Sequence, residues 1–337
     1  MTAGTLAVVG PSGLVGQEIL EILDARQLPV GAVRLLGSVR TAGAEIERGG
    51  QTERIALLEA NSFDGIDLAF FAAGPRVAGE HAAVAAAAGT RVIDLSSRFR
   101  LDPAVPLIVP EVNAAALRDG GEHGIVASPS AIAIALAVVL APLRAAAGLR
   151  RVVVSTYQGT AGAGRAAVNR LSRETVELLA GRGHRQRMTD RPRAFNCIPQ
   201  VGTLEPGGAT AQELQVVEEV RKTLLEPALA LSVTAVRVPT FFGYGLSVTC
   251  ETAQPLAAPA ATEVLRQAPG VLVHDEPPEP YQTPVEVVGS DATHVGRIRS
   301  DVAVEHGLAF WIALDNVRKG AALNAVEIAE ILVRDLA

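Results

Sequence analysis

Residues 6–16 read LAVVGPSGLVG and place three glycines, at positions 10, 13 and 16, directly after a short apolar stretch. Leu6–Val9 is expected to form a strand, and the amphipathic stretch Gln17–Arg26 a helix. Glycines in such a turn let the backbone approach a pyrophosphate while helix N–H groups point toward it. Two residues separate each pair of glycines, which differs from the commoner fingerprint. A tight strand–helix turn without a ligand therefore stays open.

Strands and helices alternate through the first part of the chain. Further strands are expected at 33–36, 67–72, 91–95, 106–110 and 125–127, with an alanine-rich helix near 80–88. This alternation predicts an α/β domain with a parallel sheet and helices on both faces. After about residue 150, longer alternating strands are expected at 151–157, 231–239 and 246–251, with helices at 163–180, 211–225 and 259–268. They predict an α+β domain with a mostly antiparallel sheet, and the amphipathic stretch 319–336 is expected to return to the first domain.

Composition narrows the class of protein. Of 337 residues, 49% are apolar and 20% are charged, which is typical of a globular chain, and the net charge of −6 argues against nucleic acid as a partner. Two distant cysteines and no visible signal peptide predict a cytoplasmic protein. The longest apolar run, Ala131–Leu143, is too short to span a membrane and predicts a buried helix. No cluster of His, Cys or carboxylates has metal-ligand spacing, so we expect no metal.

Two stretches carry possible anion-binding groups. The second expected strand ends in Gly37–Gly43, where Ser38 and Arg40 stand in place of the acidic residue usual for NAD. A hydroxyl and a guanidinium suit a 2′-phosphate, which favours NADP, although Arg40 as an ordinary surface arginine remains open. The basic stretch 182–193 is interpreted as a solvated loop or subunit contact, with anion binding as the alternative.

The segment Ser128-Pro129-Ser130-Ala131 opens the long apolar helix. Ser128 is a good N-cap and Pro129 suits the first helical position. The start of a helix lowers the pKa of a cysteine and can hold an oxyanion, yet Ala131 can neither attack nor ionise.

Ordered segments along about 320 residues resemble the aspartate-semialdehyde dehydrogenase family. They are Gly10–Gly16, Ser38–Gly43, Asp94–Arg100, Val109–Asn113, Ser155–Gly164, Ala194–Gln200, Arg237–Pro239, Val295–Arg299 and Asp315–Ala322. The resemblance implies an NADP-binding Rossmann-like domain at 1–130 and 317–337, an α+β catalytic and dimerisation domain at 131–316, and a homodimer. The cofactor-binding residues it implies are Gly10, Ser12, Gly13, Leu14, Val15, Gly16, Ser38, Arg40, Gly74 and Asn316.

The family's reaction defines which groups the chain would need. A cysteine thiolate attacks the aldehyde, hydride leaves to NADP, and phosphate releases the acyl group. The family's Asn-Pro-Asn-Cys aligns with 128–131, which puts Ala131 at the nucleophile position, and its Gly-His aligns with Gly243-Tyr244, which puts Tyr244 at the base position. Its Glu-Glu-x-Lys aligns with 212–215, so Gln212 and Gln215 replace charged groups that handle substrate and phosphate.

Other functional positions are retained. Arg237 matches the carboxylate-binding arginine, Arg100 the phosphate-binding arginine, and Gln158 the residue that orients the intermediate. Each of them also has a purely structural interpretation.

Stand-ins for the lost groups are weak. Ser130 is better explained by helix capping. Tyr244 is a poor base at neutral pH because a phenol has a pKa of about 10. Cys197 is more simply interpreted as a small hydrophobic residue. We therefore expect a non-catalytic homologue that acts in binding or regulation, with a dinucleotide and a small carboxylate as possible ligands. It resembles the Usg-1 type of homologue, which lacks the catalytic cysteine and whose role the sequence does not disclose. Two alternatives stay open: an NADP-dependent oxidoreductase on another small carboxylate or acyl substrate, and residual aspartate-semialdehyde dehydrogenase activity in amino-acid biosynthesis, carried by Cys197 or another group.

Overall fold

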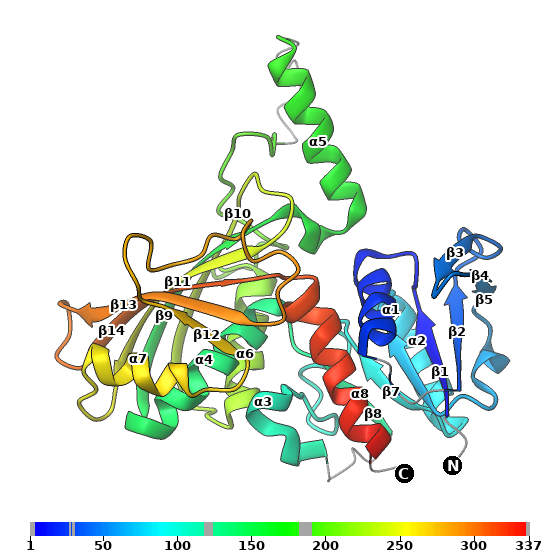
Figure 1. Cartoon of the computed structure of the whole chain (residues 1–337), viewed down its shortest axis with the longest axis horizontal. Helices are drawn as coiled ribbons and strands as arrows, with labels where there is room; N and C mark the ends of the chain where they lie inside the picture. Colours follow the sequence, from blue (N-terminus) through cyan, green and yellow to red (C-terminus); the bar gives the residue numbers. More distant parts are fainter. Residues whose placement is uncertain (1–3, 27, 29–30, 118–123, 182–190, 335–337) are drawn as a thin grey trace. The chain divides into compact units, whose positions relative to one another are not determined.

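The computed structural model describes residues 4–26, 28, 31–117, 124–181 and 191–334 (Figure 1). The chain divides into two compact units. Unit 1 comprises Met1–Ile134, Lys222–Leu224 and Gly320–Ala337, and unit 2 comprises Ala135–Arg221 and Leu225–Lys319. The return of the chain at Lys222–Leu224 was not foreseen from the sequence. The domain limits expected at residues 130 and 317 stay a prediction, and residues 182–190 of the basic stretch lie outside the described residues.

Unit 1 is built on a six-stranded parallel sheet in the order β5-β2-β1-β6-β7-β8. Helix α1 (Leu14–Arg26) and helix α8 (Asn324–Arg334) share one apolar cluster with Leu6 and Val8, while α2 (Pro75–Ala87) packs with Ala7 and Val9. Alternate residues of a strand face opposite sides, so helices cover both faces of the sheet. Its strands are β1 (Thr5–Val9), β2 (Ala32–Gly37), β5 (Ala56–Leu57), β6 (Leu68–Phe71), β7 (Arg91–Asp94) and β8 (Ile125–Ala127).

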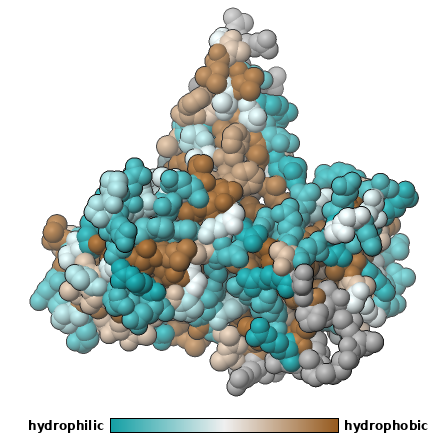
Figure 2. Space-filling model, viewed as in Figure 1, coloured by the Kyte–Doolittle hydropathy of each residue, from teal (hydrophilic) through white to brown (hydrophobic). Residues whose placement is uncertain are grey.

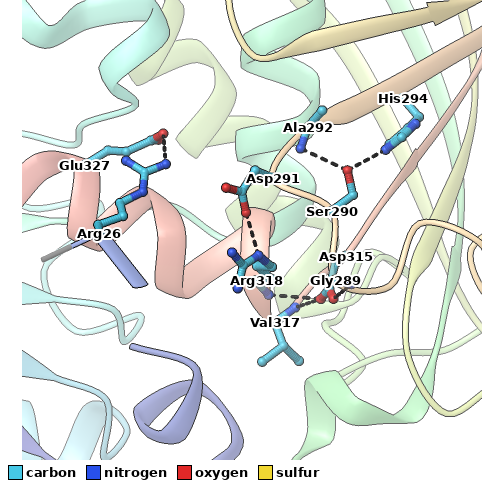
Figure 3. Close-up of polar contacts among 10 residues, drawn as sticks. All are labelled: Arg26, Gly289, Ser290, Asp291, Ala292, His294, Asp315, Val317, Arg318 and Glu327. Atoms are coloured by element: carbon cyan, nitrogen blue, oxygen red, sulfur yellow. Dashed lines mark hydrogen bonds and ion pairs between the residues drawn. The ribbon is translucent and has the colours of Figure 1, made fainter. Parts of the chain in front are cut away.

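Ion pairs join the C-terminal helix α8 to the first helix α1. Arg26 on α1 pairs with Glu327 on α8 at 3.5 Å (Figure 3). It also pairs with Glu330 on the same helix at 3.0 Å. Smaller elements complete this part of the chain: the hairpin β3 (Glu45–Arg48) and β4 (Gln51–Arg54), the turns η1 (Ala60–Phe63) and η2 (Ala114–Leu117), the short α3 (Pro110–Asn113), and the π-helical η4 (Arg318–Leu323).

Two local predictions in unit 1 are wrong. Residues 106–110 do not form a strand: Leu107 makes only an isolated bridge to Ala127, and α3 begins at Pro110. The prolines at both ends of this segment lack the N–H groups that a ladder needs. Helix α4 (Ala131–Ala147) begins two residues later than expected, so Ser128 is not its N-cap.

Unit 2 contains a six-stranded mixed sheet in the order β10-β9-β11-β14-β13-β12. Its three central pairings are antiparallel, but both outer pairings, β10 with β9 and β12 with β13, are parallel, which was not expected. The predicted architecture, a Rossmann-like α/β domain with a parallel sheet plus an α+β domain, is confirmed. The strands are β9 (Leu149–Gln158), β10 (Ala230–Arg237), β11 (Tyr244–Thr252), β12 (Val271–His274), β13 (Thr293–Asp301) and β14 (Gly307–Leu314).

Helical elements accompany this sheet along the described part of the chain. Helix α5 stands away from the strands of unit 2 (green in Figure 1). None of the described helices combines the length and apolar character needed to cross a membrane. Besides α4, which starts in unit 1, the helical elements are η3 (Thr160–Ala163), α5 (Arg165–Leu179), α6 (Ala211–Leu224) and α7 (Ala258–Arg266).

A chain of polar contacts fixes the segment before β13 (Figure 3). Asp315 accepts hydrogen bonds from the N–H groups of Gly289, Val317 and Arg318 at 2.8–2.9 Å. Ser290 Oγ lies 2.7 Å from His294 Nε2, and His294 Nδ1 lies 2.9 Å from His274 Nε2. Burial, and second the charge of His274, lower the pKa of His294 from 6.5 to about 4. The imidazole of His294 is therefore neutral in the folded protein near pH 7.

This shift predicts a pH-dependent stability. Between pH 6.5 and about 4 the unfolded chain binds a proton at His294 that the folded chain does not, so stability is full above pH 6.5 and falls as the pH drops. The shift corresponds to about 3 kcal/mol at most. His294→Leu should flatten the dependence of the free energy of unfolding on pH between 7.5 and 4.5, measured by urea denaturation. His81→Gln serves as the control, and an equal slope in His294→Leu and the wild type would contradict the assignment.

Candidate functional site

The turn after β1 has the backbone geometry that the glycines predict. Gly10 has φ +88°, a conformation that favours glycine, and a Cβ on Gly16 would lie 2.2 Å from the carbonyl oxygen of Gly10. Helix α1 can therefore start close to the sheet only because residue 16 has no side chain. The order β2-β1-β6 makes the β1–β6 boundary the switch point of the sheet, and Gly74 begins α2 after β6 on the same edge.

Ser38 and Arg40 lie at the carboxyl end of β2, the strand beside β1. The carbonyl oxygen of Ser38 accepts hydrogen bonds from the N–H groups of Thr41 and Ala42, both at 2.8 Å, which forms a tight turn. Both side chains are exposed. The edge of the unit 1 sheet thus offers a glycine turn, a helix start, a hydroxyl and a guanidinium, the groups that a phosphorylated dinucleotide requires.

The start of α4 is held by its neighbours in unit 1. Ser130 caps the helix, since its Oγ accepts the N–H of Ala133 at 3.4 Å, as the capping interpretation predicted. Ser128 is buried and accepts a hydrogen bond from Asn324 Nδ2 at 2.9 Å. Arg100 donates to the carbonyl oxygens of Ser128 (2.9 Å) and Leu95 (2.7 Å). Ala131, the first residue of α4, places a methyl group there.

Lys222 fixes the loop that carries Arg100, a role that no signal in the sequence indicated. Its Nζ donates to three carbonyl oxygens, those of Arg100 (2.9 Å), Asp102 (2.6 Å) and Val105 (2.7 Å). Burial lowers the pKa of Lys222, and the charge of Asp102 opposes this shift. All of these groups belong to unit 1, and Arg100 is at least partly a structural residue.

Three of the predicted site residues form one row across the sheet of unit 2. Gln158 ends β9 and is in register with both Arg237, which ends β10, and Tyr244, which begins β11. The side chains of register partners point to the same face of a sheet. Arg237 Nη1 donates to the carbonyl oxygen of Gly159, and its backbone exchanges hydrogen bonds with Ile198 at 2.8 and 2.9 Å.

Tyr244 fills the site as a neutral phenol. It is 5% exposed, and a Cβ on Gly162 would lie only 1.7 Å from its hydroxyl oxygen, so the hydroxyl occupies the space above that glycine. Burial raises the pKa of Tyr244 above its ordinary value of 10, while Arg237, by charge and a hydrogen bond, opposes the shift. At neutral pH the hydroxyl can donate a hydrogen bond but cannot accept a proton as a base.

Helix α6 presents amides beside this row. Gln158 Nε2 donates to Gln212 Oε1 at 3.0 Å and to Thr156 Oγ1 at 3.1 Å. Within the part of the chain that the structure describes, Gln158 Oε1 and Gln215 Nε2 are buried without a hydrogen-bond partner. Buried polar atoms usually have a hydrogen-bond partner, so this unpaired acceptor and this unpaired donor are exceptions within the described residues.

Glu213, the carboxylate between the two glutamines, has a structural role. Its Oε2 accepts the N–H of Thr210 at 2.6 Å, while Thr210 Oγ1 accepts the N–H of Glu213 at 3.2 Å, which together form a capping box. Its Oε1 accepts the N–H of Ala235 on β10 at 2.7 Å. The Thr-x-x-Glu spacing at 210–213 is the sequence signal that could have predicted this cap.

The remaining candidates lie elsewhere in unit 2. Asn316 is buried and its Oδ1 accepts the N–H of Gly243 at 3.0 Å. Cys197 is exposed, whereas Cys250 is buried and burial, then the charge of Asp301, raises its pKa to about 12. The described residues contain no group of three or more His, Cys, Asp or Glu side chains arranged to hold a metal ion. The predicted site residues of the row and of α6 are one guanidinium (Arg237), one phenol (Tyr244) and three amides (Gln158, Gln212 and Gln215), a set suited to hydrogen bonding of a ligand, while the carboxylate of Glu213 is taken up by backbone N–H groups.

Comparison with known proteins places this arrangement in a family. Residues 5–120 match the family model for the semialdehyde dehydrogenase NAD binding domain, and residues 140–319 match that for the semialdehyde dehydrogenase dimerisation domain. Aspartate-semialdehyde dehydrogenases of Aquifex aeolicus and a Shewanella species are each 40% identical over 333 residues, 98% of both chains.

Solved structures match the fold of this chain over its full length. The crystal structure of aspartate semialdehyde dehydrogenase II from Vibrio cholerae superimposes with a TM-score of 0.96, and that of a probable aspartate-semialdehyde dehydrogenase from Pseudomonas aeruginosa with 0.93. Each is 37% identical, and each alignment covers 100% of both chains. The chain therefore belongs to the aspartate-semialdehyde dehydrogenase family.

Proposed function

We propose that this protein is a non-catalytic member of its family, of the Usg-1 type, that binds a dinucleotide and a small carboxylate in a regulatory or binding role. The observation that carries the proposal is the pair of replacements at the positions the resemblance assigns to nucleophile and base. Ala131 has no group that can form a covalent bond to an aldehyde, and Tyr244 is a buried phenol with a raised pKa.

The charged positions of α6 support the same proposal. Gln212 and Gln215 are neutral where the resemblance expects charged groups, whereas Glu213, which caps the helix and bonds to β10, is kept. The carboxylate with a structural role therefore persists, while the groups that would handle substrate and phosphate do not. This pattern is typical of a fold retained after its chemistry was lost.

Residual or altered chemistry is the second candidate. Cys197 is exposed and is the one described thiol that could react. An NADP-dependent reduction of another carboxylate-bearing aldehyde would need no cysteine, because hydride transfer can proceed without a covalent intermediate. The experiments below separate these possibilities.

The wild-type chain should show no phosphorylating dehydrogenase activity. Loss of a nucleophile or its base costs on the order of 10⁴- to 10⁶-fold in rate, and losing the second adds little. NADPH formation from aspartate semialdehyde, NADP and phosphate, followed by absorbance, should therefore remain at background. Turnover within about a hundredfold of a cysteine-bearing relative would refute the proposal. Cys197→Ser then identifies the source: loss of any residual rate would assign it to this thiol.

Restoring the lost groups provides the matched test. With NADP present to accept the hydride and phosphate left out, Ala131→Cys combined with Tyr244→His should convert aspartate semialdehyde into a thioester on the introduced thiol together with NADPH, detected by mass spectrometry of the intact protein. Ala131→Ser with Tyr244→His is the control, because it has similar size but a far weaker nucleophile. Thioester formation would show that the chain still accepts the family's substrate, and its absence would point to the replacements Gln212 and Gln215 as the cause.

We also propose that the cofactor is NADP rather than NAD. The glycine turn at Gly10–Gly16 supports dinucleotide binding, and Arg40 at the end of β2 supports the 2′-phosphate. A fluorescence titration should show that NADPH binds more tightly than NADH. Arg40→Ala should weaken NADPH binding by about tenfold and leave NADH unchanged, since one charge-assisted contact is lost. If neither NADPH nor NADH binds, the proposal that this protein binds a dinucleotide is wrong.

A homodimer is part of the proposal. The match of residues 140–319 to a dimerisation domain supports it, and so does helix α5, over which Figure 2 shows apolar surface. Val176 and Leu179 on this helix are 64% and 76% exposed. A cytoplasmic location is also proposed, since both cysteines are free.

Light scattering should give twice the mass of the chain in solution. Replacing Val176 and Leu179 by glutamate should shift the protein toward the mass of a single chain, because charges would be buried at the contact. Val302→Glu is the control, since Val302 is fully exposed on another part of unit 2. A single-chain mass for the wild type would contradict the dimer.

A further inference from the structure

A serine and two histidines of unit 2 form a continuous line of hydrogen bonds (Ser290 and His294 in Figure 3). Ser290 Oγ lies 2.7 Å from His294 Nε2, and His294 Nδ1 lies 2.9 Å from His274 Nε2. When the hydroxyl of Ser290 donates to Nε2, His294 carries its own proton on Nδ1 and donates it to His274. This order is that of a serine nucleophile, its general base and the group that orients the base. We call Ser290, His294 and His274 the serine triad.

The pairing of β12 with β13 brings the two imidazoles together. In this parallel register Leu272 is opposite His294 and His274 is opposite Gly296, so the histidines are diagonal neighbours on one face of the sheet. Their ring centroids are 5.1 Å apart. A Cβ on Gly296 would lie 2.4 Å from the carbonyl oxygen of Pro280, so backbone occupies the place of a side chain opposite His274. Strands therefore hold the base and the group that orients it, which fixes their geometry better than a loop would.

The turn that carries Ser290 is held on both sides (Figure 3). Gly289, whose φ of +86° favours glycine, donates its N–H to Asp315 Oδ2 at 2.8 Å. On the other side, Asp291 forms an ion pair with Arg318. The backbone at Ser290 is therefore fixed before a substrate binds, which reduces the entropy lost in reaching a reactive geometry.

The contacts of the triad also suit proton transfer from Ser290. The N–H of Ala292 donates to Ser290 Oγ at 3.2 Å, and this hydrogen bond stabilises negative charge on the oxygen. Burial, and second the charge of His274, lower the pKa of His294 to about 4, so its imidazole is unprotonated at neutral pH, as a base must be. The same low pKa makes His294 a weaker base than an ordinary histidine. We therefore expect slow turnover.

The surroundings of the triad indicate which substrates it takes. Ser290 and His274 are half-buried, so both keep some exposed surface. Asp291 is exposed directly after Ser290. Hydrogen bonds from Thr283 lower the pKa of Glu286, and the charge of His274 adds to this shift, so an ionised carboxylate lies near His274. Two carboxylates beside the triad disfavour a substrate that carries negative charge.

We propose that Ser290 is the nucleophile of an esterase site that takes uncharged short-chain carboxylic esters. Its Oγ attacks the carbonyl carbon while its proton passes to His294 Nε2. The bond from this carbon to the alcohol oxygen then breaks, and the alcohol leaves with that proton. Water next gives a proton to His294 and attacks the acyl group, and the carboxylic acid leaves as Ser290 Oγ regains the proton. His274 is a positioning residue, because it accepts the Nδ1 proton and so orients the imidazole.

Labelling of the full-length protein with an uncharged alkyl fluorophosphonate ester tests the nucleophile. Ser290 Oγ should displace fluoride from phosphorus, and peptide mass spectrometry should locate the adduct at this residue. Ser290→Ala should abolish the adduct. His294→Gln should slow labelling by about 100-fold or more, since a general base contributes roughly 10²- to 10⁴-fold. The control is Ser300→Ala, which removes an exposed serine further along β13 and should leave labelling unchanged.

Two results of the labelling experiment would overturn the proposal. One is a wild-type protein whose Ser290 takes up no label. The other is an equal rate of labelling in the wild type and His294→Gln, with circular dichroism reporting native folding in both.

Hydrolysis of p-nitrophenyl acetate measures the complete cycle. The assay uses a Cys197→Ala background, because an exposed thiol also reacts with activated esters. Release of p-nitrophenolate should continue beyond one equivalent per chain, and adding Ser290→Ala should reduce its rate by about tenfold or more. The p-nitrophenyl monoester of succinate, which is anionic, should react more slowly. An undiminished rate in the Ser290→Ala variant overturns the proposal, and equal rates for the two esters overturn the substrate class.

A pair of variants tests the role of His274. His274→Gln keeps an oxygen that can accept the Nδ1 proton and should retain most of the labelling rate. His274→Leu removes the acceptor and should slow labelling by about tenfold, since one hydrogen bond to the base is lost. Equal labelling rates in the two variants would overturn this role. None of these assays contains NADP or phosphate, so their outcome does not depend on whether the proposed function is correct.

Discussion

The strand register among β10, β9 and β11 determines which side chains lie together at the candidate site of unit 2. Because Arg237, Gln158 and Tyr244 are register partners at one end of the strands, their side chains lie close together on one face of the sheet. A shift of one residue in either strand would turn one of them to the opposite face. The polar row is thus a property of the sheet as a whole, and it persists when the chemical character of its members changes.

The sequence predicted the elements better than the contacts between them. The glycine turn, α1, α6 and five strands of the first sheet follow from local periodicity and could be located to within a few residues, whereas the two-residue β5 is too short to leave such a pattern. Residues 106–110 were wrongly predicted to form a strand because an apolar run between prolines resembles one. The prolines lack the N–H groups that the hydrogen bonds of a ladder need. The start of α4 was misplaced because Ser128 and Ser130 are both suitable caps, and only the bond from Asn324 to Ser128 separates them.

The candidate site was predictable in its members but not in their interactions. The roles of Arg237 and Gln158 came from a family resemblance, yet nothing local indicated that Glu213 bonds to β10 or that Glu174 holds the backbone of Arg193 and Ala194. Both contacts join residues about 20 positions apart through backbone N–H groups, which leave no signature in side-chain type. Such contacts also explain which charges persist: a carboxylate that satisfies several buried N–H groups is costly to remove even when catalysis is gone.

The clamp formed by Arg170 and Glu174 joins two regions that would otherwise be independent. Helix α5 carries the exposed apolar side chains Val176 and Leu179, and through the clamp the same helix holds the backbone of residues 191, 193 and 194. Any contact that displaces α5 therefore also moves the backbone that leads from residue 194 to the end of β10, where Ile198 and Arg237 exchange two hydrogen bonds.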